Sequence, residues 1–283
     1  MSAHADAGPV VPEAAAGPGP LTFLAWANVT IGATAAAMTW ITSLALHRPA
    51  DPLTGVFVFC FIAALHTRDR LQSAGDGTSE RSAWMARHAR RLTRWAGACV
   101  AVLLALVVAR PWCGAALATA GAMSWFYATP LLRWRGRRLA PRQLPGLKLP
   151  FVMTVWVVVG VLLPAAQQHR LPDPRTWYLA LAVLLIGGVT TLLNDLRDLD
   201  ADRRDGTRTL PVLLGERRTR LLAYTMAACG VLVGQLVLPV PITLWALYNV
   251  TILALYRPRP GVHPRPWADA QGLLFLAVTL LAG

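Results

Sequence analysis

Long apolar runs, each ended by charged or proline-rich residues, are the feature that most constrains the fold of this 283-residue chain. The runs lie at roughly residues 21–46, 52–66, 94–109, 111–132, 149–166, 176–194, 220–238, 240–256 and 267–283. An α-helix needs about 20 residues to cross a bilayer, and most of these runs approach that length, although the second and the last are shorter. We therefore predict an all-α, polytopic integral membrane protein with about nine transmembrane helices.

The composition agrees with a membrane protein and disagrees with a water-soluble domain. Hydrophobic residues make up 55% of the chain and charged residues only 14%, whereas soluble domains carry about 25% charge. The net charge is nevertheless +13. Nucleic-acid binding would require a basic face on a soluble fold, so we expect no nucleic-acid partner and place the positive charge in loops between membrane spans.

The loops predict how the chain is oriented in the membrane. With nine spans, 23 of the 27 Lys and Arg residues fall on one side, and the opposite loops hold only Arg48, Arg110, Arg170 and Arg175. Basic residues near span ends stay cytoplasmic, which predicts a cytoplasmic N-terminus and an external C-terminus in the cell membrane. We expect residues 1–19 to be a disordered tail and residues 20–283 to form a single transmembrane domain. The four cysteines lie in apolar runs without short paired spacing and indicate neither zinc nor a disulfide.

Acidic residues are scarce, and six of the 14 fall in one window after the sixth run: Asp195, Asp198, Asp200, Asp202, Asp205 and Glu216. At 100° per residue, Asp195, Asp198, Asp202 and Asp205 lie within an arc of about 80° on a helix, whereas Asp200 points to the far side. Like charges at this spacing destabilise a helix by a few tenths of a kcal/mol per pair. The stripe therefore requires a counter-cation.

Two kinds of cation could neutralise this stripe. The interleaved Arg197, Arg203 and Arg204 would give a solvated, self-paired helix. A divalent metal is the alternative, because Mg²⁺ binds one or two carboxylates together with substrate phosphate oxygens. The hydroxyl groups and the guanidinium of residues 207–209 could contact a phosphate. Carboxylates beside such donors, at the mouth of a membrane helix, favour a site that ionises a diphosphate ester.

The same segment resembles a motif of a known family. Residues 194–215 read NDLRDLDADRRDGTRTLPVLLG and are similar to the second aspartate-rich motif of the UbiA superfamily of intramembrane prenyltransferases. That motif is Asp-x-x-Asp-x-x-x-Asp followed by Gly-x-Arg-Thr-Leu-Pro and Leu-Gly. The resemblance implies helices around a central cavity, with aspartate motifs in the cytoplasmic loops after helices 2 and 6. It also implies Mg²⁺ ligands and diphosphate contacts, which fall here on Asp195, Asp198 and Asp202, and on Asn194 and Arg208, respectively.

The first aspartate motif of the family falls on residues 65–73, where this chain departs from the pattern. Only Asp69 and Arg70 match, because Leu65, His66 and Ser73 stand where the family has Asn, Asp and Asp. The resemblance implies that Asp69 is a metal ligand and that Arg70 contacts the diphosphate. For Asp69, a solvated loop acid is the alternative.

Two further segments resemble parts of that family. Tyr127 opens a Tyr-x-x-Pro segment, which implies that its side chain contacts the diphosphate or stabilises a cation with its ring; a tyrosine anchored at the membrane interface is the alternative. The loop before the fifth run resembles the one that supplies basic partners to the pyrophosphate. It implies that Arg142 and Lys148 contact the substrate, although the positive-inside rule alone would also place them there.

The resemblance implies an enzyme that uses Mg²⁺ to ionise a prenyl diphosphate of ten to twenty carbons or longer. Asp198, Asp202 and Tyr127 would be catalytic, pyrophosphate would leave, and a lipophilic, aromatic acceptor would capture the prenyl cation. A UbiA-type terpene cyclase, in which an internal double bond captures the cation, stays open because of the altered first motif. A transporter or non-catalytic membrane protein is a third reading. Transporters are expected to carry charges or Gly/Pro breaks in the middle of their spans, and mid-span ionisable residues are almost absent here.

Overall fold

The computed structural model describes residues 20–73, 80–129, 132–134, 137–139, 141, 144–204, 207–256 and 271–282. These ranges are helical almost throughout, which confirms the all-α class. The helices are α1 (Pro20–Trp26), α2 (Val29–Ala45), α3 (Pro52–Ser73), α4 (Glu80–Arg87), α5 (Ala89–Ala109), α6 (Pro111–Ala128), α7 (Lys148–Val157), η3 (Val158–Leu162), α8 (Leu163–Gln167), α9 (Pro174–Arg197), α10 (Leu199–Arg204), α11 (Leu210–Leu214), α12 (Glu216–Gly234), α13 (Pro239–Leu255) and α15 (Gln271–Ala282). Strands β1 (Leu132–Trp134) and β2 (Arg137–Leu139) pair as a short antiparallel ribbon.

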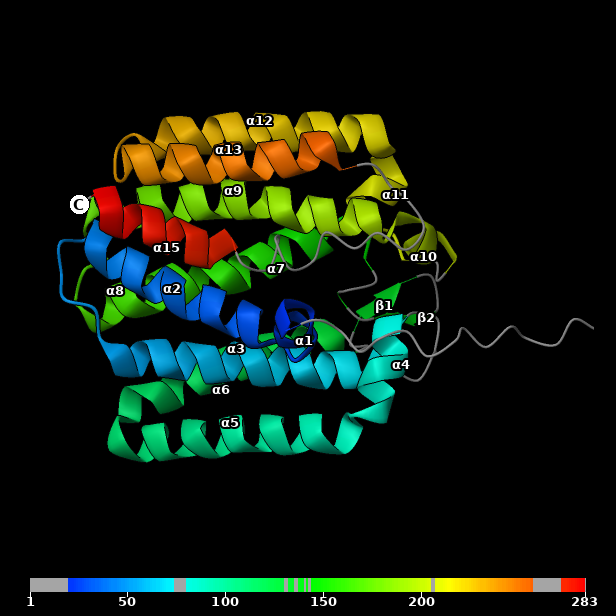
Figure 1. Cartoon of the computed structure of the whole chain (residues 1–283), viewed down its shortest axis with the longest axis horizontal. Coiled ribbons are helices and arrows are strands. Elements are labelled where there is room, and N and C mark those ends of the chain that lie inside the picture. Colours follow the sequence, from blue (N-terminus) through cyan, green and yellow to red (C-terminus); the bar gives the residue numbers. More distant parts are fainter. Residues whose placement is uncertain are drawn as a thin grey trace, which may run out of the picture.

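The long helices lie side by side in one bundle (Figure 1). Of the three long apolar segments, α9 is the most enclosed, with 61% of its most apolar stretch buried, whereas α5 at the edge has 22%. Helix α9 packs against α7, α12 and α13, and α2 packs against α3 and α15. The fully buried Ile41, Leu179 and Ile186 belong to the core that joins α2 to α9. Helix α9 therefore provides a rigid support for the acidic residues at its end.

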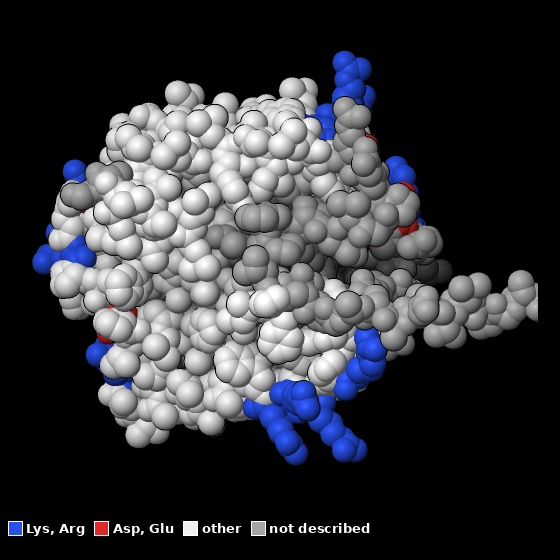
Figure 2. Space-filling view, viewed as in Figure 1, with Lys and Arg blue, Asp and Glu red and all other residues white. Residues whose placement is uncertain are grey.

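The outside of the bundle is apolar. Val108, Leu255 and Leu281 are 86%, 77% and 89% exposed, and charged side chains lie toward the margins of the face shown in Figure 2. Soluble monomers rarely expose large apolar patches, whereas lipid tails accept such side chains readily. The bundle therefore has the surface of a polytopic membrane protein.

Within the described part of the chain, three helical segments are long and apolar enough to cross a membrane: Ala89–Ala109, Lys148–Gln167 and Pro174–Arg197. The second comprises α7, η3 and α8. Three shorter apolar helices accompany them: Val29–Ala45, Pro239–Leu255 and Gln271–Leu281. A helix of 17 residues reaches about 26 Å, close to the thickness of about 30 Å of the hydrocarbon core. A total of nine spans stays a prediction.

The chain departs from the predicted runs in two places near its start. The first run is divided into α1 and α2 at Asn28, whose φ of 61° is left-handed, a conformation that Asn tolerates better than most residues. Its side-chain amide donates to the hydroxyl of Thr67 at 3.1 Å. Helix α3 continues to Ser73, beyond the expected end near residue 66, so the first aspartate motif lies on a helix and not in a loop.

A polar cluster fastens the end of the bundle opposite α10 and α11. The carboxylate of Asp51, just before α3, accepts from Arg110 at 2.5 Å, Gln167 at 2.7 Å and Thr54 at 2.8 Å, and from the backbone N–H of Leu53 at 3.1 Å. Burial raises the pKa of Asp51, but these hydrogen bonds and the charge of Arg110 outweigh burial and hold that pKa below its usual value. This Asp51 clamp joins α3 to the α5–α6 connection and to the end of α8.

Candidate functional site

Helix α9 carries the predicted acidic stripe to one end of the bundle. The helix starts sharply because Pro174 occupies its first turn and the carboxylate of Asp173 accepts from the N–H of Arg175 at 3.0 Å. It ends at Arg197, since Asp198 has a ψ of 7° that departs from the helix. Asp195 is therefore a buried residue in the last turn of an otherwise apolar helix.

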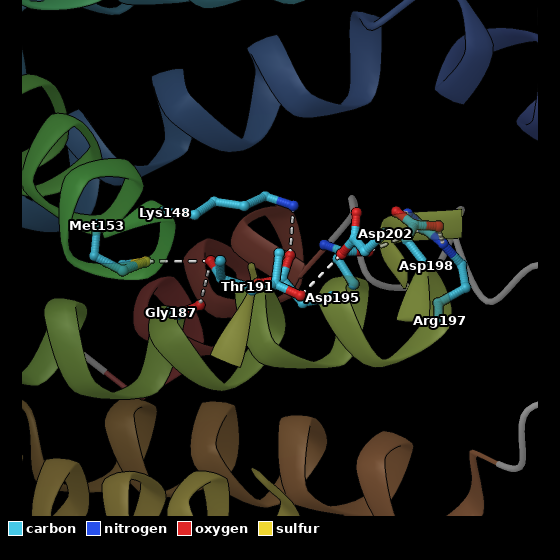
Figure 3. A network of polar contacts seen from close by, with 10 residues as sticks. Lys148, Met153, Gly187, Thr191, Asp195, Arg197, Asp198 and Asp202 are labelled. Atoms are coloured by element: carbon cyan, nitrogen blue, oxygen red, sulfur yellow. Dashed lines mark hydrogen bonds and ion pairs between the residues drawn. The ribbon is translucent and has the colours of Figure 1, made fainter. Parts of the chain in front are cut away.

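Asp195 is paired with Lys148, the first residue of α7 (Figure 3). The Lys148 ammonium lies 2.6 Å from Oδ1 of Asp195, and the side chains are 33% and 2% exposed, respectively. Oδ2 of Asp195 is buried and has no hydrogen-bond partner. The charges of Asp202 and Asp198 also act on the Lys148 ammonium. We call Asp195, Asp198 and Asp202 the acid cluster.

Asp198 is paired with its neighbour Arg197. Two guanidinium nitrogens, Nε and Nη2, donate to the Asp198 carboxylate at 2.7 and 2.5 Å, and Nη1 donates to the side-chain oxygen of Asn194 at 3.0 Å. Asp200, which is 87% exposed, lies 3.4 Å from Arg203. Self-pairing by interleaved arginines, one of the two predicted alternatives, is therefore present at Asp198 and Asp200, whereas Asp195 draws its cation from another helix.

Asp202 is held by the segment that follows it. The hydroxyl of the buried Thr209 donates to Oδ2 of Asp202 at 3.0 Å, and the N–H of Thr207 donates to the backbone carbonyl of Asp202 at 2.8 Å. The carbonyl of Arg208 accepts from the N–H of Gly146 at 3.0 Å, while the Arg208 side chain is exposed. The segment at residues 207–209 and the loop before Lys148, both predicted from the sequence to contact phosphate, are therefore in direct contact.

Residues 144–147 form the turn that makes this meeting possible. Gly146 has a φ of 70°, and the N–H of Leu147 lies 3.3 Å from the carbonyl of Leu144, which is the geometry of a turn with Pro at its second position and Gly at its third. Sequence reasoning did not assign Gly146 a role, although the Pro145-Gly146 pair was the available signal. The turn positions Lys148 above the end of α9.

The predicted helical stripe is interrupted in the structure. Helix α9 ends at Arg197 and α10 begins at Leu199, because Asp198 leaves helical geometry. The backbone bonds from Asp198 to Asn194 and from Asp202 to Asp198, at 3.1 and 2.8 Å, keep the two helices nearly continuous. Asp205 lies outside the described residues. A single continuous stripe was therefore wrong in detail, and each member of the acid cluster has a different partner.

The acid cluster suits a divalent cation that shares its coordination with a substrate. Among the described residues, no three His, Cys, Asp or Glu side chains are grouped closely enough to hold a metal ion on their own. Mg²⁺ does not need such a group, because it commonly takes one or two carboxylates together with phosphate oxygens and waters. The unpartnered Oδ2 of Asp195 supplies an acceptor whose burial is otherwise unfavourable. The residues present therefore fit Mg²⁺ together with a diphosphate.

The other predicted site residues lie on neighbouring elements. Asp69, exposed, and Arg70, half-buried, are on the last turns of α3, at the same end of the bundle as α10 and α11 (Figure 1). Tyr127 is near the end of α6, and its ring stacks on Phe151 of α7 with centroids 4.0 Å apart. Arg142 lies outside the described residues. Phe151, which sequence reasoning missed, links Tyr127 to the first turn of α7.

Two cavities formed by described residues lie away from the acid cluster. One of about 510 Å³ is lined by Leu44, His47, Arg48 and the start of α13, at the opposite end of the bundle. The other, of about 250 Å³, lies between α1, α4 and α5 and is lined by residues such as Phe23, Trp84 and Trp95. A central cavity next to the acid cluster therefore stays a prediction.

The apolar bundle and the charged site at its end define a polytopic α-helical membrane protein that holds desolvated carboxylates at a helix mouth. A sequence model of the UbiA prenyltransferase family matches residues 144–277, from the turn before Lys148 into α15. This match, over a little under half of the chain, supports membership of the UbiA superfamily, whose function is intramembrane prenyl transfer in general terms. The matched range contains the second aspartate motif and begins after residues 65–73. A search of curated proteins gave no match to the chain.

Proposed function

We propose that the chain binds a prenyl diphosphate at the acid cluster in the presence of Mg²⁺ and transfers the prenyl group to a lipophilic aromatic acceptor. The observation that carries the proposal is the buried Asp195, with one carboxylate oxygen on Lys148 and the other without a partner. A carboxylate this desolvated is unfavourable unless cations accompany it. A bound divalent cation and its diphosphate would satisfy that requirement.

The chain's own charges would hold and neutralise the diphosphate. Mg²⁺, when bound, supplies positive charge to the leaving oxygens, with Asp198 and Asp202 as its principal carboxylates and Asp195 and Asp69 assisting. Lys148 lies beside the acid cluster, and Arg208 has an exposed guanidinium on the adjoining loop. Both, together with Asn194, Arg70 and Arg142, are proposed diphosphate contacts. Charge neutralisation in a low-dielectric site lowers the barrier to heterolysis more than it would in water.

The bond changes follow from this arrangement. The allylic C–O bond breaks, and its electron pair leaves with the pyrophosphate. The acceptor forms a new bond to the allylic carbon, and an aromatic acceptor then loses a proton. The Tyr127 ring, held flat against Phe151, is placed near the start of α7, where the negative face of an aromatic ring could stabilise the prenyl cation. The hydrocarbon tail would lie among the apolar helices.

Terpene cyclisation is a second candidate, and the altered first motif is the observation that favours it. Leu65, His66 and Ser73 replace the Asn and the two acids of that motif, and the family match does not extend to this segment. In a cyclase the cation is captured by an internal double bond, and no acceptor is consumed.

Purified protein should be incubated with Mg²⁺ and prenyl diphosphates of ten to twenty carbons, and pyrophosphate release should be measured. Release that depends on Mg²⁺ is the expected result. No release with any chain length would refute both enzymatic candidates and leave a non-catalytic membrane protein or a transporter. Product analysis without an acceptor separates the two candidates: a cyclic hydrocarbon or alcohol indicates cyclisation, whereas product that forms only with an aromatic acceptor indicates transfer.

We also propose that the acid cluster faces the cytoplasm and that the N-terminus lies on the same side. The support is the distribution of basic residues, since the connections at the opposite end of the bundle carry only Arg48, Arg110, Arg170 and Arg175.

A further inference from the structure

We propose that Lys148 is an exchangeable counter-ion of the acid cluster. In the metal-free chain its ammonium neutralises Asp195, and a divalent cation takes its place on that carboxylate while Lys148 turns to the anionic substrate. This inference rests on the proposed function and extends it, because it assigns Lys148 two successive partners and makes release of Asp195 a condition of metal binding.

Asp195 is deeply buried. Its side chain is 2% exposed, and removing one partner of a buried ion pair is strongly unfavourable because an uncompensated charge remains. While Asp195 is ionised, a cation must therefore stay close to it. Its second oxygen is buried without a hydrogen bond, so the single contact with Lys148 leaves the carboxylate only partly satisfied. A divalent cation can contact that carboxylate more completely than one ammonium does.

The two cations paired with the acid cluster differ in how firmly they are held. Arg197 donates two hydrogen bonds to Asp198 and is only 7% exposed, so it stays in place. A metal ion would share the 40% exposed Asp198 carboxylate with Arg197 and would not displace it. Lys148 makes one contact with Asp195 and is 33% exposed. An ammonium is a compact charge on a flexible stem, whereas a guanidinium forms a rigid fork. Of these two pairs, the one between Lys148 and Asp195 is suited to exchange.

The position of Lys148 in its helix also favours exchange. It is the first residue of α7, where the positive end of the helix dipole disfavours a cation. Local helix energetics therefore do not explain a lysine at this position, whereas the charges of Asp195, Asp202 and Asp198 do. A diphosphate bound nearby would be favoured by the same helix terminus. Lys148 thus lies between the Asp195 carboxylate, with which it is paired in this structure, and the N-terminus of α7, where an anion would be stabilised.

The chain provides a direct test because Lys148 is its only lysine. The full-length protein in nanodiscs should be treated with an amine-acylating reagent at fixed pH, and acylated Lys148 should be quantified by peptide mass spectrometry, with the N-terminal amine as internal reference. We expect Mg²⁺ alone, without diphosphate, to increase the acylation rate about tenfold, because a hydrogen bond between charged groups limits access to the free amine by about that factor.

Two variants give this measurement its controls. Asp195→Asn should acylate rapidly without Mg²⁺ and should no longer respond to it. Asp200→Asn, which alters an exposed acid paired with Arg203, should behave as the parent chain. Should Asp195→Asn not fold, Lys148→Met can be titrated with Mn²⁺ and the free ion followed by electron paramagnetic resonance. Its affinity should then be about tenfold higher than that of the parent, because a competing cation has been removed.

An acylation rate that Mg²⁺ leaves unchanged or lowers, or an unchanged Mn²⁺ affinity in Lys148→Met, would overturn the exchange. The proposed function is judged separately by pyrophosphate release. If release depends on Mg²⁺ but acylation does not, only the exchange is wrong. If acylation responds to Mg²⁺ but no diphosphate is consumed, the exchange stands and the proposed reaction is wrong.

Discussion

Replacing three aspartates of one segment should affect turnover very unequally. Asp202 accepts a 3.0 Å hydrogen bond from the buried Thr209 and acts electrostatically on Lys148. Asp200 is 87% exposed and lies 3.4 Å from Arg203. Exposed pairs of this kind contribute less than about 1 kcal/mol. The structure therefore predicts that the charge of Asp202, and not that of Asp200, matters for catalysis.

The expected magnitudes can be ordered from these contacts. Asp202→Asn keeps an oxygen for Thr209 but removes the charge, and loss of one preorganised electrostatic group costs about 10²- to 10³-fold in turnover. Thr209→Val leaves the Asp202 charge in place but removes a hydrogen bond worth about 1.5 kcal/mol, or about tenfold. Asp200→Asn should change turnover by less than about twofold. Asp198→Asn should resemble Asp202→Asn.

The assay is Mg²⁺-dependent pyrophosphate release, with kcat and KM measured separately for each variant. Thermal unfolding in detergent should accompany it, so that loss of fold is not mistaken for loss of turnover. Equal losses from Asp200→Asn and Asp202→Asn would refute the reasoning, since the acids would then act only through their summed charge. A Thr209→Val protein with unchanged turnover would show that the contact with Asp202 does not position the carboxylate.

Three further predictions concern stability and orientation. Gly146→Ala should lower the melting temperature, because a left-handed φ of 70° costs a non-glycine residue about 1 to 2 kcal/mol; Gly97→Ala, in open space on α5, should be neutral or stabilising and serves as its control in thermal unfolding. The lowered pKa of Asp51 means that its clamp stabilises the fold above the unfolded-state value of about 3.9 and loses this effect as the pH falls through the folded-state value. Melting curves should therefore shift downward at acid pH, and less so for Asp51→Asn. Reporter fusions should place the N-terminus inside and the C-terminus outside the cell, and the reverse result would refute the predicted orientation.

Much of the fold followed from hydrophobic length alone. Every apolar run that falls in the described residues is occupied by helix, because an uninterrupted run of this length leaves little else for the backbone to form. The break at Asn28 could not be foreseen, since it depends on a left-handed residue and a contact with Thr67, 39 positions away in the chain. The extension of α3 to Ser73 reflects helix-forming residues, such as Arg68 and Arg70, that hydropathy does not recognise.

The candidate site was foreseen as a segment but not as a set of contacts. Helical periodicity placed Asp195 and Asp202 on one face, and the second motif indicated a resemblance to the UbiA family. Neither the periodicity nor the motif could show that Lys148 would pair with Asp195, 47 positions away, because that pairing depends on how α7 packs against α9. Whether Arg197 would bind Asp198, or a metal would, was likewise left open by periodicity, since the spacing accommodates both.

The Asp51 clamp gives the two ends of the bundle different mechanical roles. Four donors converge on a single carboxylate at that end. Two of them, Arg110 and Gln167, come from other elements, so separating the helices there would break contacts that no incoming ligand replaces. At the acid end, the contact of Lys148 with Asp195 is one that a bound cation and anion could replace. Separating the helices to admit a long hydrocarbon chain therefore requires the least free energy at the acid end. The Asp51 clamp would keep the helices together at the opposite end.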